Sequence, residues 1–371
     1  MNLSKSIDFL LENAGDVIKY RLHKEILKDI NKTQDENLLE KVLWTPYYKL
    51  VESYAKPNGY IGIGMHSADR FMETRLQDGE AAARLLSYYA IPKTNPLIKN
   101  YVAAMRDDEI LKGEFEFYPP ALEQYMTRYD GIRNGTSLMV VAYTLQALLG
   151  YGDDEYVKPF RDTSIEAFNS IINVSSISEL AKYNEKLIKR YKTPYYVEQD
   201  TYVPCAYHLT TLAYTNAWKT EENIDMLAKV INHINNNELM KGANGVLAKT
   251  GGKYGGSLWM LLYPLSPFKI DTIQGVMYRR VLTEIAMLGV GSKVDIIRET
   301  VVNLKEALAK DGVLRWEFTS SYQKQQFRAQ KWPTAYCDIW LETDHKKANA
   351  LECDLTFWAV QLLSILGQAE W

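Results

Sequence analysis

Residues 134–149 read Asn-Gly-Thr-Ser-Leu-Met-Val-Val-Ala-Tyr-Thr-Leu-Gln-Ala-Leu-Leu, a polar cluster followed directly by a long apolar run. Side-chain oxygens in such a cluster accept hydrogen bonds from the unpaired N–H groups of a first helical turn, so the stretch predicts a capped helix. The same arrangement occurs five times, at Asp78-Gly-Glu80, Asn134-Gly-Thr136, Asp200-Thr201, Asp271-Thr272 and Asp354-Leu-Thr356. The clusters begin 56, 66, 71 and 83 residues apart, which is typical of helical hairpins with their connections. This spacing predicts a closed ring of helical hairpins.

Helices that are apolar on most sides alternate along the chain with helices that carry one apolar stripe. Residues 138–149 are of the first kind, whereas residues 221–235 and 293–309 are of the second. A helix buried on all sides belongs to the interior and a striped helix to the surface. The sequence therefore predicts an all-α fold, an (α/α) toroid of about five to six hairpins with inner and outer rings. An open solenoid would show shorter repeats of about 34 to 47 residues.

Helix is expected over most of the chain, and strand signals are nearly absent. The expected helices cover residues 6–12, 17–29, 38–54, 80–90, 96–105, 121–129, 136–149, 156–172, 179–191, 205–218, 221–235, 275–288, 293–309 and 355–366. A long irregular loop is expected around residues 242–268, which contain eight Gly or Pro residues. A repeat architecture can hold 371 residues around one core, so we expect a single domain over residues 1–371.

Composition limits the partners and the compartment. The chain is 47% hydrophobic and 24% charged, which is ordinary for a globular protein, and its formal charge is −3 with no long run of either sign. We therefore expect no nucleic acid as a partner. No stretch reaches about 18 consecutive apolar residues, so no membrane span is expected. Three widely spaced cysteines and the lack of a signal peptide favour a cytoplasmic protein with reduced thiols. Oligomeric state is left open.

Several short turns share a Gly-centred pattern. Asn58-Gly-Tyr60, Asn244-Gly-Val246 and Asp311-Gly-Val-Leu-Arg-Trp316 resemble the Asp-Gly-x-Trp turn of prenyltransferase and squalene-cyclase repeats, and Tyr254-Gly-Gly-Ser-Leu-Trp259 resembles the Gly-Ser-Trp part of the same element. The opening residues 6–12 and 17–21 resemble the start of bacterial proteins with such repeats. The resemblance implies the α/α toroid of the terpenoid cyclase and protein prenyltransferase superfamily, with a central cavity ringed by inner-helix ends.

The reaction motifs of that superfamily are not present. No Asp-x-Asp-Asp motif of class II cyclases occurs, and neither Asp107-Asp108 nor Asp153-Asp154 is followed by the third carboxylate of the class I magnesium motif. The Cys-Asp pairs at 337–338 and 353–354 have the wrong order for a prenyltransferase zinc site. No family residue is therefore carried over to this chain, and no cofactor is expected.

Cys205 and His208 lie three residues apart on an expected inner helix. This spacing suits a metal site or a thiolate–imidazolium pair, and zinc is the metal that such ligands favour. A zinc site would need further ligands from His66, Cys337 or Asp338, with no spacing to support them. The alternative is a buried cysteine beside a hydrogen-bonded core histidine.

A second candidate site follows the Gly-rich residues 59–64. His66, Asp69 and Arg70 place a base, an acid and a cation within five residues. A histidine beside a carboxylate is typical of a general base with an orienting partner, and Arg70 is a candidate for substrate binding. The alternative is a capped turn held by a local salt bridge. The Gly order is not that of a dinucleotide-binding motif.

Aromatic side chains are the only substrate signal. Residues 332–345 mix aromatics with acids, including the catalytic candidate Asp338, and suit either a lid or a structural cover. Asp200 precedes an inner helix and is a further catalytic candidate. Rings in a cavity can hold apolar chains, stabilise carbocations or stack on sugars. The aromatic candidates for substrate binding are Tyr60, Tyr202, Trp259, Trp316, Trp332 and Tyr336.

The leading functional hypothesis is binding and conversion of an apolar or isoprenoid-like small molecule in an aromatic-lined central cavity. One alternative is a carbohydrate-active (α/α)6 enzyme with a carboxylate pair such as Asp69 and Asp200. Another is a helical scaffold without catalysis. The sequence favours an enzyme without assigning its class. Acids flanked by exposed Trp platforms would favour sugar, and a closed apolar tunnel would favour an isoprenoid.

Overall fold

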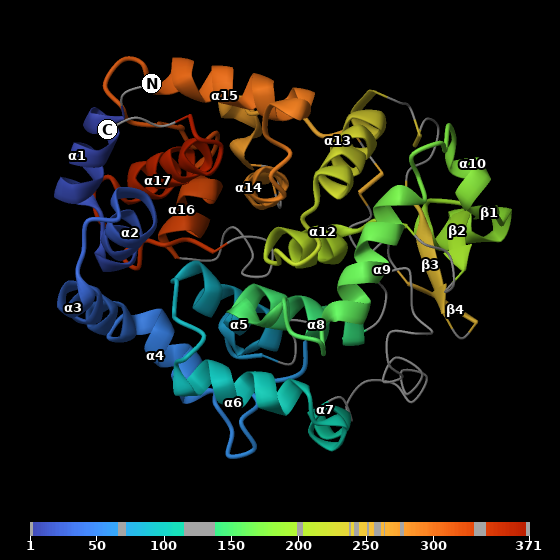
Figure 1. Ribbon diagram of the computed structural model, residues 1–371, viewed down its shortest axis with the longest axis horizontal. Helices are drawn as coiled ribbons and strands as arrows, with labels where there is room; N and C mark the ends of the chain where they lie inside the picture. Colours follow the sequence, from blue (N-terminus) through green and yellow to red (C-terminus); the bar gives the residue numbers. More distant parts are fainter. Residues whose placement is uncertain are drawn as a thin grey trace. The chain divides into compact units, whose positions relative to one another are not determined.

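The computed structural model describes residues 3–65, 72–114, 138–198, 203–236, 239–240, 245–250, 252–255, 261–262, 264–274, 278–329 and 339–368. Within these ranges it has seventeen α-helices and four short strands (Figure 1), so the mostly helical fold is confirmed. Two compact units are formed, one by residues 1–101, 267–286 and 296–371 and the other by residues 102–266 and 287–295. The toroid and the single domain stay predictions.

The first unit joins both ends of the chain. Its helices are α1 (Ser4–Asn13), α2 (Asp16–Arg21), α3 (Lys32–Leu43), α4 (Pro46–Ser53), α5 (Gly79–Tyr88), the first part of α6 (Pro96–Met105), α14 (Tyr278–Met287), α15 (Asp295–Leu308), α16 (Ser321–Arg328) and α17 (Ala350–Ile365). A π-helix, η1 (Leu22–Leu27), continues α2, and 3-10 turns lie at η3 (Arg75–Gln77) and η8 (Ile270–Gln274). Twelve of the sixteen residues of α17 are buried, and it packs against α1 and α2 (Figure 1). It is an interior helix, as its sequence predicts.

The prediction of one helix over residues 38–54 is wrong. The chain forms α3, which opens at Lys32 with a capping box between Asn31 and Gln34, and then α4, which begins at Pro46. Proline has no backbone N–H to donate and its fixed φ suits a first helical position, so Pro46 starts a new helix instead of continuing the old one. The break leaves Trp44 at the corner between α3 and α4.

The capping clusters have different outcomes. Asp78 caps α5 as predicted, since its side chain accepts from the N–H groups of Glu80 at 2.9 Å and Ala81 at 3.2 Å. The prediction that Asp354 caps a helix is wrong, because α17 begins four residues earlier, at Ala350. Asp271 lies in the 3-10 turn η8. The clusters at residues 134–136 and 200–201 lie outside the described residues.

The second unit contains helices and a small sheet. Its helices are α7 (Asp108–Glu114), α8 (Leu138–Gln146), α9 (Lys158–Asn169), α10 (Ile177–Leu180), α11 (Ile188–Tyr191), α12 (Ala206–Ala213) and α13 (Glu221–Asn236), with the π-helix η6 (Ala147–Tyr151) and the 3-10 turns η7 (Glu185–Leu187) and η9 (Gly291–Lys293). Every residue of α12 is buried, and this helix packs against α8 and α9. Five of the sixteen residues of α13 are buried, as expected for a striped surface helix.

The prediction of one continuous helix over residues 179–191 is wrong, because a short strand at residues 182–183 separates α10 from η7 and α11. This strand belongs to a four-stranded sheet of the order β1-β2-β3-β4, formed by β1 (Lys182–Tyr183), β2 (Tyr195–Glu198), β3 (Leu247–Thr250) and β4 (Lys253–Gly255). The strands β2 and β3 pair in parallel, although about fifty residues of chain separate them, so a local periodicity cannot show their pairing. The segment 242–268, predicted to be irregular, thus supplies two strands.

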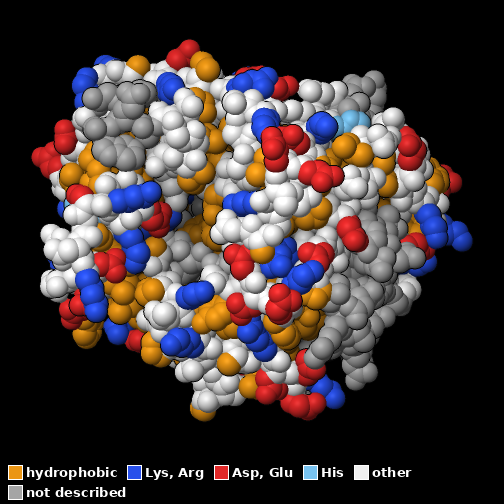
Figure 2. All heavy atoms as spheres, viewed as in Figure 1, with side chains coloured by type: hydrophobic (Ala, Val, Ile, Leu, Met, Phe, Trp, Pro, Cys, Tyr) orange, Lys and Arg blue, Asp and Glu red, His pale blue; other side chains and the backbone are white. Residues whose placement is uncertain are grey.

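Charges of both signs are interspersed on the face of the molecule that Figure 2 shows, in keeping with the absence of long runs of one sign in the sequence. Among the described residues, no helix combines the length and the apolar character needed to cross a membrane.

Candidate functional site

A groove in the first unit brings together residues from three separate segments. It has a volume of about 700 Å³ and is lined by Asp16, Asn37, Glu40, Lys41, Trp44, Thr45, Pro46 and Thr343. This volume lies within the range of small-molecule sites, about 300 to 1,000 Å³. The groove is therefore large enough for one small ligand.

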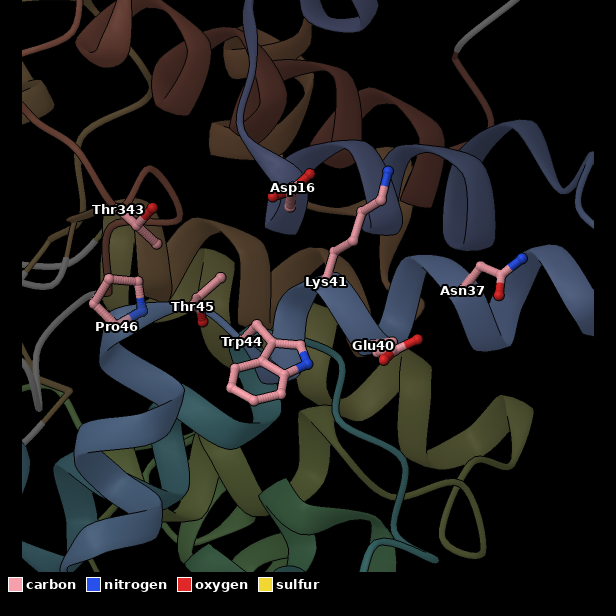
Figure 3. Close-up of a pocket in the computed structure, with 8 residues that line it drawn as sticks. All are labelled: Asp16, Asn37, Glu40, Lys41, Trp44, Thr45, Pro46 and Thr343. Carbon is pink, nitrogen blue, oxygen red and sulfur yellow. The ribbon is translucent and has the colours of Figure 1, made fainter.

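One face of α3 and its continuation supplies most of the groove (Figure 3). Asn37, Glu40, Lys41 and Trp44 follow the spacing i, i+3, i+4 and i+7, which places their side chains along one helical stripe. Asp16, the first residue of α2, lies on the side toward which Lys41 extends. The wall thus offers carboxylate, amide and ammonium groups around an indole ring.

Trp44 is the most unusual residue of this groove. Its side chain is 69% exposed, whereas tryptophan is highly buried on average. The Lys49 ammonium lies 4.6 Å from the ring centroid, a cation–π contact that occupies one face of the indole. The exposed remainder of the ring is a flat apolar surface inside a polar groove.

A buried cluster around the carboxyl groups of Glu342 and Asp354 lies close to the groove in sequence. Its residues Gly15, Tyr47 and Glu342 are each next in the chain to a groove residue, namely Asp16, Pro46 and Thr343. The Glu342 side chain is buried and accepts a hydrogen bond from the Gly15 N–H at 2.6 Å. Burial, together with the negative charge of Asp354, raises the pKa of Glu342 to about 7.

After burial, the charge of Asp354 is the main cause of the raised pKa of Glu342. The Asp354 carboxylate accepts from the backbone N–H groups of Leu341 at 2.7 Å and Glu342 at 3.1 Å, which stabilises its charge. Burial also raises the pKa of the Tyr89 hydroxyl, which has no hydrogen-bond partner among the described residues. A carboxyl group that titrates near neutrality has the property of a general acid, but Glu342 is only 2% exposed. Its observed contact is structural, at the start of α2.

Most residues that the sequence suggested for the site lie outside the described residues. They are His66, Asp69, Arg70, Asp200, Tyr202, Trp259, Trp332, Tyr336 and Asp338. Four others are described, namely Tyr60, Cys205, His208 and Trp316, and none of them lines the groove on α3.

Cys205 and His208 are close together, as their spacing predicts. They form a capping box at the start of α12, in which His208 Nδ1 accepts from the Cys205 N–H at 3.2 Å. Burial lowers the pKa of His208 to about 3, so the imidazole is neutral at physiological pH. In the described part of the chain no group of three or more His, Cys, Asp or Glu side chains is placed to hold a metal ion. The observed arrangement matches the core-histidine alternative.

Tyr60 and Trp316 lie in different surroundings. Tyr60 is fully buried, donates to the Gly64 carbonyl at 2.9 Å and meets Tyr101 edge-on at 5.2 Å between ring centroids. These contacts hold the Gly-rich turn. Trp316 is 8% exposed and lines a second pocket of the same unit, formed with α16 and the start of α17.

Comparison of the chain with protein-family models, curated proteins and solved structures found no match. The resemblance to the terpenoid cyclase and prenyltransferase superfamily therefore stays a prediction. The groove on α3 was missed by the sequence reasoning. The sequence feature that could have indicated this groove is the polar stripe that ends in Trp44, immediately ahead of Thr45-Pro46.

Proposed function

We propose that this protein binds a carbohydrate in the groove on α3, with Trp44 as the stacking platform. The observation that carries the proposal is the 69% exposure of this indole among polar side chains. A sugar ring has an apolar C–H face that can pack on an aromatic ring, while its hydroxyl groups need hydrogen-bond partners. An exposed Trp surrounded by such partners meets both requirements.

The polar side chains of the groove suit hydroxyl groups. Asp16 and Glu40 can accept two or more hydrogen bonds each, Asn37 can both donate and accept, and Lys41 donates. An apolar ligand would leave these groups desolvated without partners, at a cost of about 1–3 kcal/mol for each buried group. The groove chemistry thus favours a sugar over an isoprenoid chain.

The groove also contains a pair of carboxylates on different helices. Asp16 starts α2, and Glu40 lies on α3. Glycoside hydrolysis uses two carboxyl groups about 5 to 10 Å apart, one to protonate the leaving group and one to act as base or nucleophile. Asp16 and Glu40 are our candidates for this pair, and hydrolysis is the further part of the proposal that is tested separately from binding.

An apolar or isoprenoid-like ligand is a second proposal, and a specific observation supports it. Residues 139–149 of α8 and η6 are buried throughout, as an apolar inner wall requires.

The binding test uses the full-length protein and a panel of neutral mono- and oligosaccharides, followed by calorimetry and thermal shift. Replacement Trp44→Ala should lower the affinity for a bound sugar at least tenfold, or about 1.4 kcal/mol. Trp44→Phe should retain most of the affinity because it keeps a ring. Tyr322→Ala is the matched control, since Tyr322 is 67% exposed on α16 and does not line the groove.

Two results would reject carbohydrate binding: no sugar of the panel binds at millimolar concentration, or Trp44→Ala binds as well as the wild type. Hydrolysis is examined with the same sugars as chromogenic glycosides. Asp16→Asn and Glu40→Gln should each abolish turnover while sugar still binds. Turnover that survives both replacements would exclude these residues as the catalytic pair.

A further inference from the structure

A second pocket of the first unit has a charge pattern that the carbohydrate proposal does not use. Its volume is about 600 Å³, and it lies between α16, the turn at Trp316–Phe318 and the first turn of α17. Four cationic side chains line it, Lys324, Arg328, Lys346 and Lys347, against two acidic ones, Glu317 and Glu352. The pocket therefore has a surplus of positive charge in a chain whose net charge is negative.

The cations of this pocket outnumber its two carboxylates, Glu317 and Glu352. Lys324, Arg328 and Lys346 are exposed, and none of them forms an ion pair within the described part of the chain. Lys347 donates to the Asn13 carbonyl at 2.8 Å, which does not remove its charge. Unpaired cations around a concave surface create a positive potential that attracts anions.

The start of α17 adds to this potential. Asn349, at the N-cap position, has a φ of 64°, and its side chain donates to Asn13 Oδ1 at 3.1 Å instead of capping the helix. Ala350, Leu351 and Glu352 of the first turn line the pocket. A helix N-terminus carries partial positive charge, and here it acts together with the four cationic side chains.

An aromatic wall faces the same space. Trp316 and Phe318 meet edge-on with ring centroids 5.0 Å apart, and Phe327 stacks on His345 at 4.3 Å. All four rings line the pocket. Burial lowers the pKa of His345, so this ring contributes surface but no charge at neutral pH. The pocket thus combines an anion-attracting rim with a surface for apolar or ring-shaped groups.

We infer that this pocket binds a small organic phosphate monoester, with its phosphate among Lys324, Arg328 and Lys346 and its apolar or aromatic group on Trp316 and Phe318. Arg and Lys both bind phosphate, Arg by paired hydrogen bonds and Lys as a point charge. The inference is independent of carbohydrate binding, because the two pockets share no lining residue.

The experiment uses the full-length protein at constant ionic strength, with inorganic phosphate and phenyl phosphate as probes and sodium chloride as the salt control. Calorimetry should show binding of both, with phenyl phosphate at least tenfold tighter. The double replacement Arg328→Gln and Lys346→Gln should weaken binding of both probes at least tenfold. Lys99→Gln is the matched control, since Lys99 is an exposed cation of α6 outside the pocket.

The unfolding midpoint without ligand shows whether the variants fold, since exposed cations without ion pairs should leave it unchanged. Equal binding of the probes by the wild type and the double variant would overturn the inference, as would stabilisation no greater than that by chloride. Equal affinities for phosphate and phenyl phosphate would overturn the role of the aromatic wall. Sugar binding measured on the same variants should be unaffected, so failure of this inference is distinguishable from failure of the carbohydrate proposal.

Discussion

The Glu342 side chain accepts a hydrogen bond from the backbone N–H of Gly15 at 2.6 Å, although 327 positions separate the two residues in sequence. Gly15 precedes α2, so the carboxyl group ties the first helical corner to the segment that leads into α17. A Cβ atom at position 15 would lie 3.0 Å from Glu342 Oε2, which leaves little room for any side chain there. The contact closes the first unit around the chain ends.

Replacement Glu342→Gln should change the pH dependence of stability. The pKa of Glu342 is about 7 in the folded protein and about 4.5 in the unfolded chain. Between these values the folded state holds a proton that the unfolded state has released, so the contribution of this group to stability is full below about pH 4.5 and is lost as the pH rises through about 7. At pH 8 the glutamine variant should be more stable than the wild type by about 3 kcal/mol.

Urea unfolding between pH 4.5 and 8 measures this difference. The two proteins should have similar free energies of unfolding at pH 4.5 and diverge above it. Glu73→Gln serves as the control, because Glu73 is exposed and should give a curve parallel to that of the wild type. Parallel curves for Glu342→Gln would contradict the raised pKa.

His208 should not titrate in the physiological range. Burial keeps its pKa near 3 in the folded state, whereas a histidine in the unfolded chain titrates near 6.5. The unfolded state therefore takes up a proton first, and stability falls by about 1.4 kcal/mol for each pH unit below 6.5 as far as the folded pKa. The His208→Gln variant, which can keep the capping interaction, should lose this dependence.

Proton NMR of the imidazole signals from pH 5 to 8 tests this directly. The signal that disappears in His208→Gln should keep the same chemical shift over this pH range. A midpoint near 6.5 for that signal would show that the ring is accessible to water.

The thiols of Cys205 and Cys353 should be unreactive in the folded protein. Both side chains are buried, and burial raises the pKa of Cys353 to about 12. The thiolate is the reactive form, so neither cysteine should react with an aromatic disulfide reagent within minutes at pH 8. A Cys337→Ser variant leaves only these two thiols. It should release no dye before denaturant is added and two equivalents afterwards, and fast release without denaturant would refute the burial of one of them.

Local signals predicted some helices to within one residue. The helix expected at residues 96–105 is observed as α6, and the striped helix at 221–235 is α13 with one added residue. Asp78 caps α5 because the capping bond joins residues two and three apart, which a sequence pattern can show. Asp354 fails the same rule because a distant partner, the backbone at residues 341–342, takes its carboxylate instead.

The candidate site was less accessible to sequence reasoning. The three segments that line the groove on α3 are separated along the chain, and only tertiary packing joins them. The spacing of Cys205 and His208 indicated that their side chains lie close together. It could not indicate the burial that lowers the pKa of His208 and keeps its ring neutral. The predicted helix over residues 38–54 placed Trp44 in its middle, where a single exposed apolar side chain does not indicate a binding site. Recognising the Thr45-Pro46 break would have put this ring at a corner.

The ion pair between Glu80 and Arg84 should be the most sensitive electrostatic contact of α5. Both side chains are at most 1% exposed, and Arg84 Nη2 donates to Glu80 Oε1 at 3.0 Å. Glu80→Ala leaves a buried guanidinium without this partner, so the free energy of unfolding should fall by about 3 to 5 kcal/mol in urea titrations. In contrast, Asp162→Ala should cost less than about 1 kcal/mol, because the Lys158–Asp162 pair has the same i,i+4 spacing but is exposed. The double variant Glu80→Leu with Arg84→Met should lose less stability than the sum of the losses of Glu80→Leu alone and Arg84→Met alone, because it removes both charges together. Additive losses would show that the two side chains are stabilised by other neighbours and not by each other.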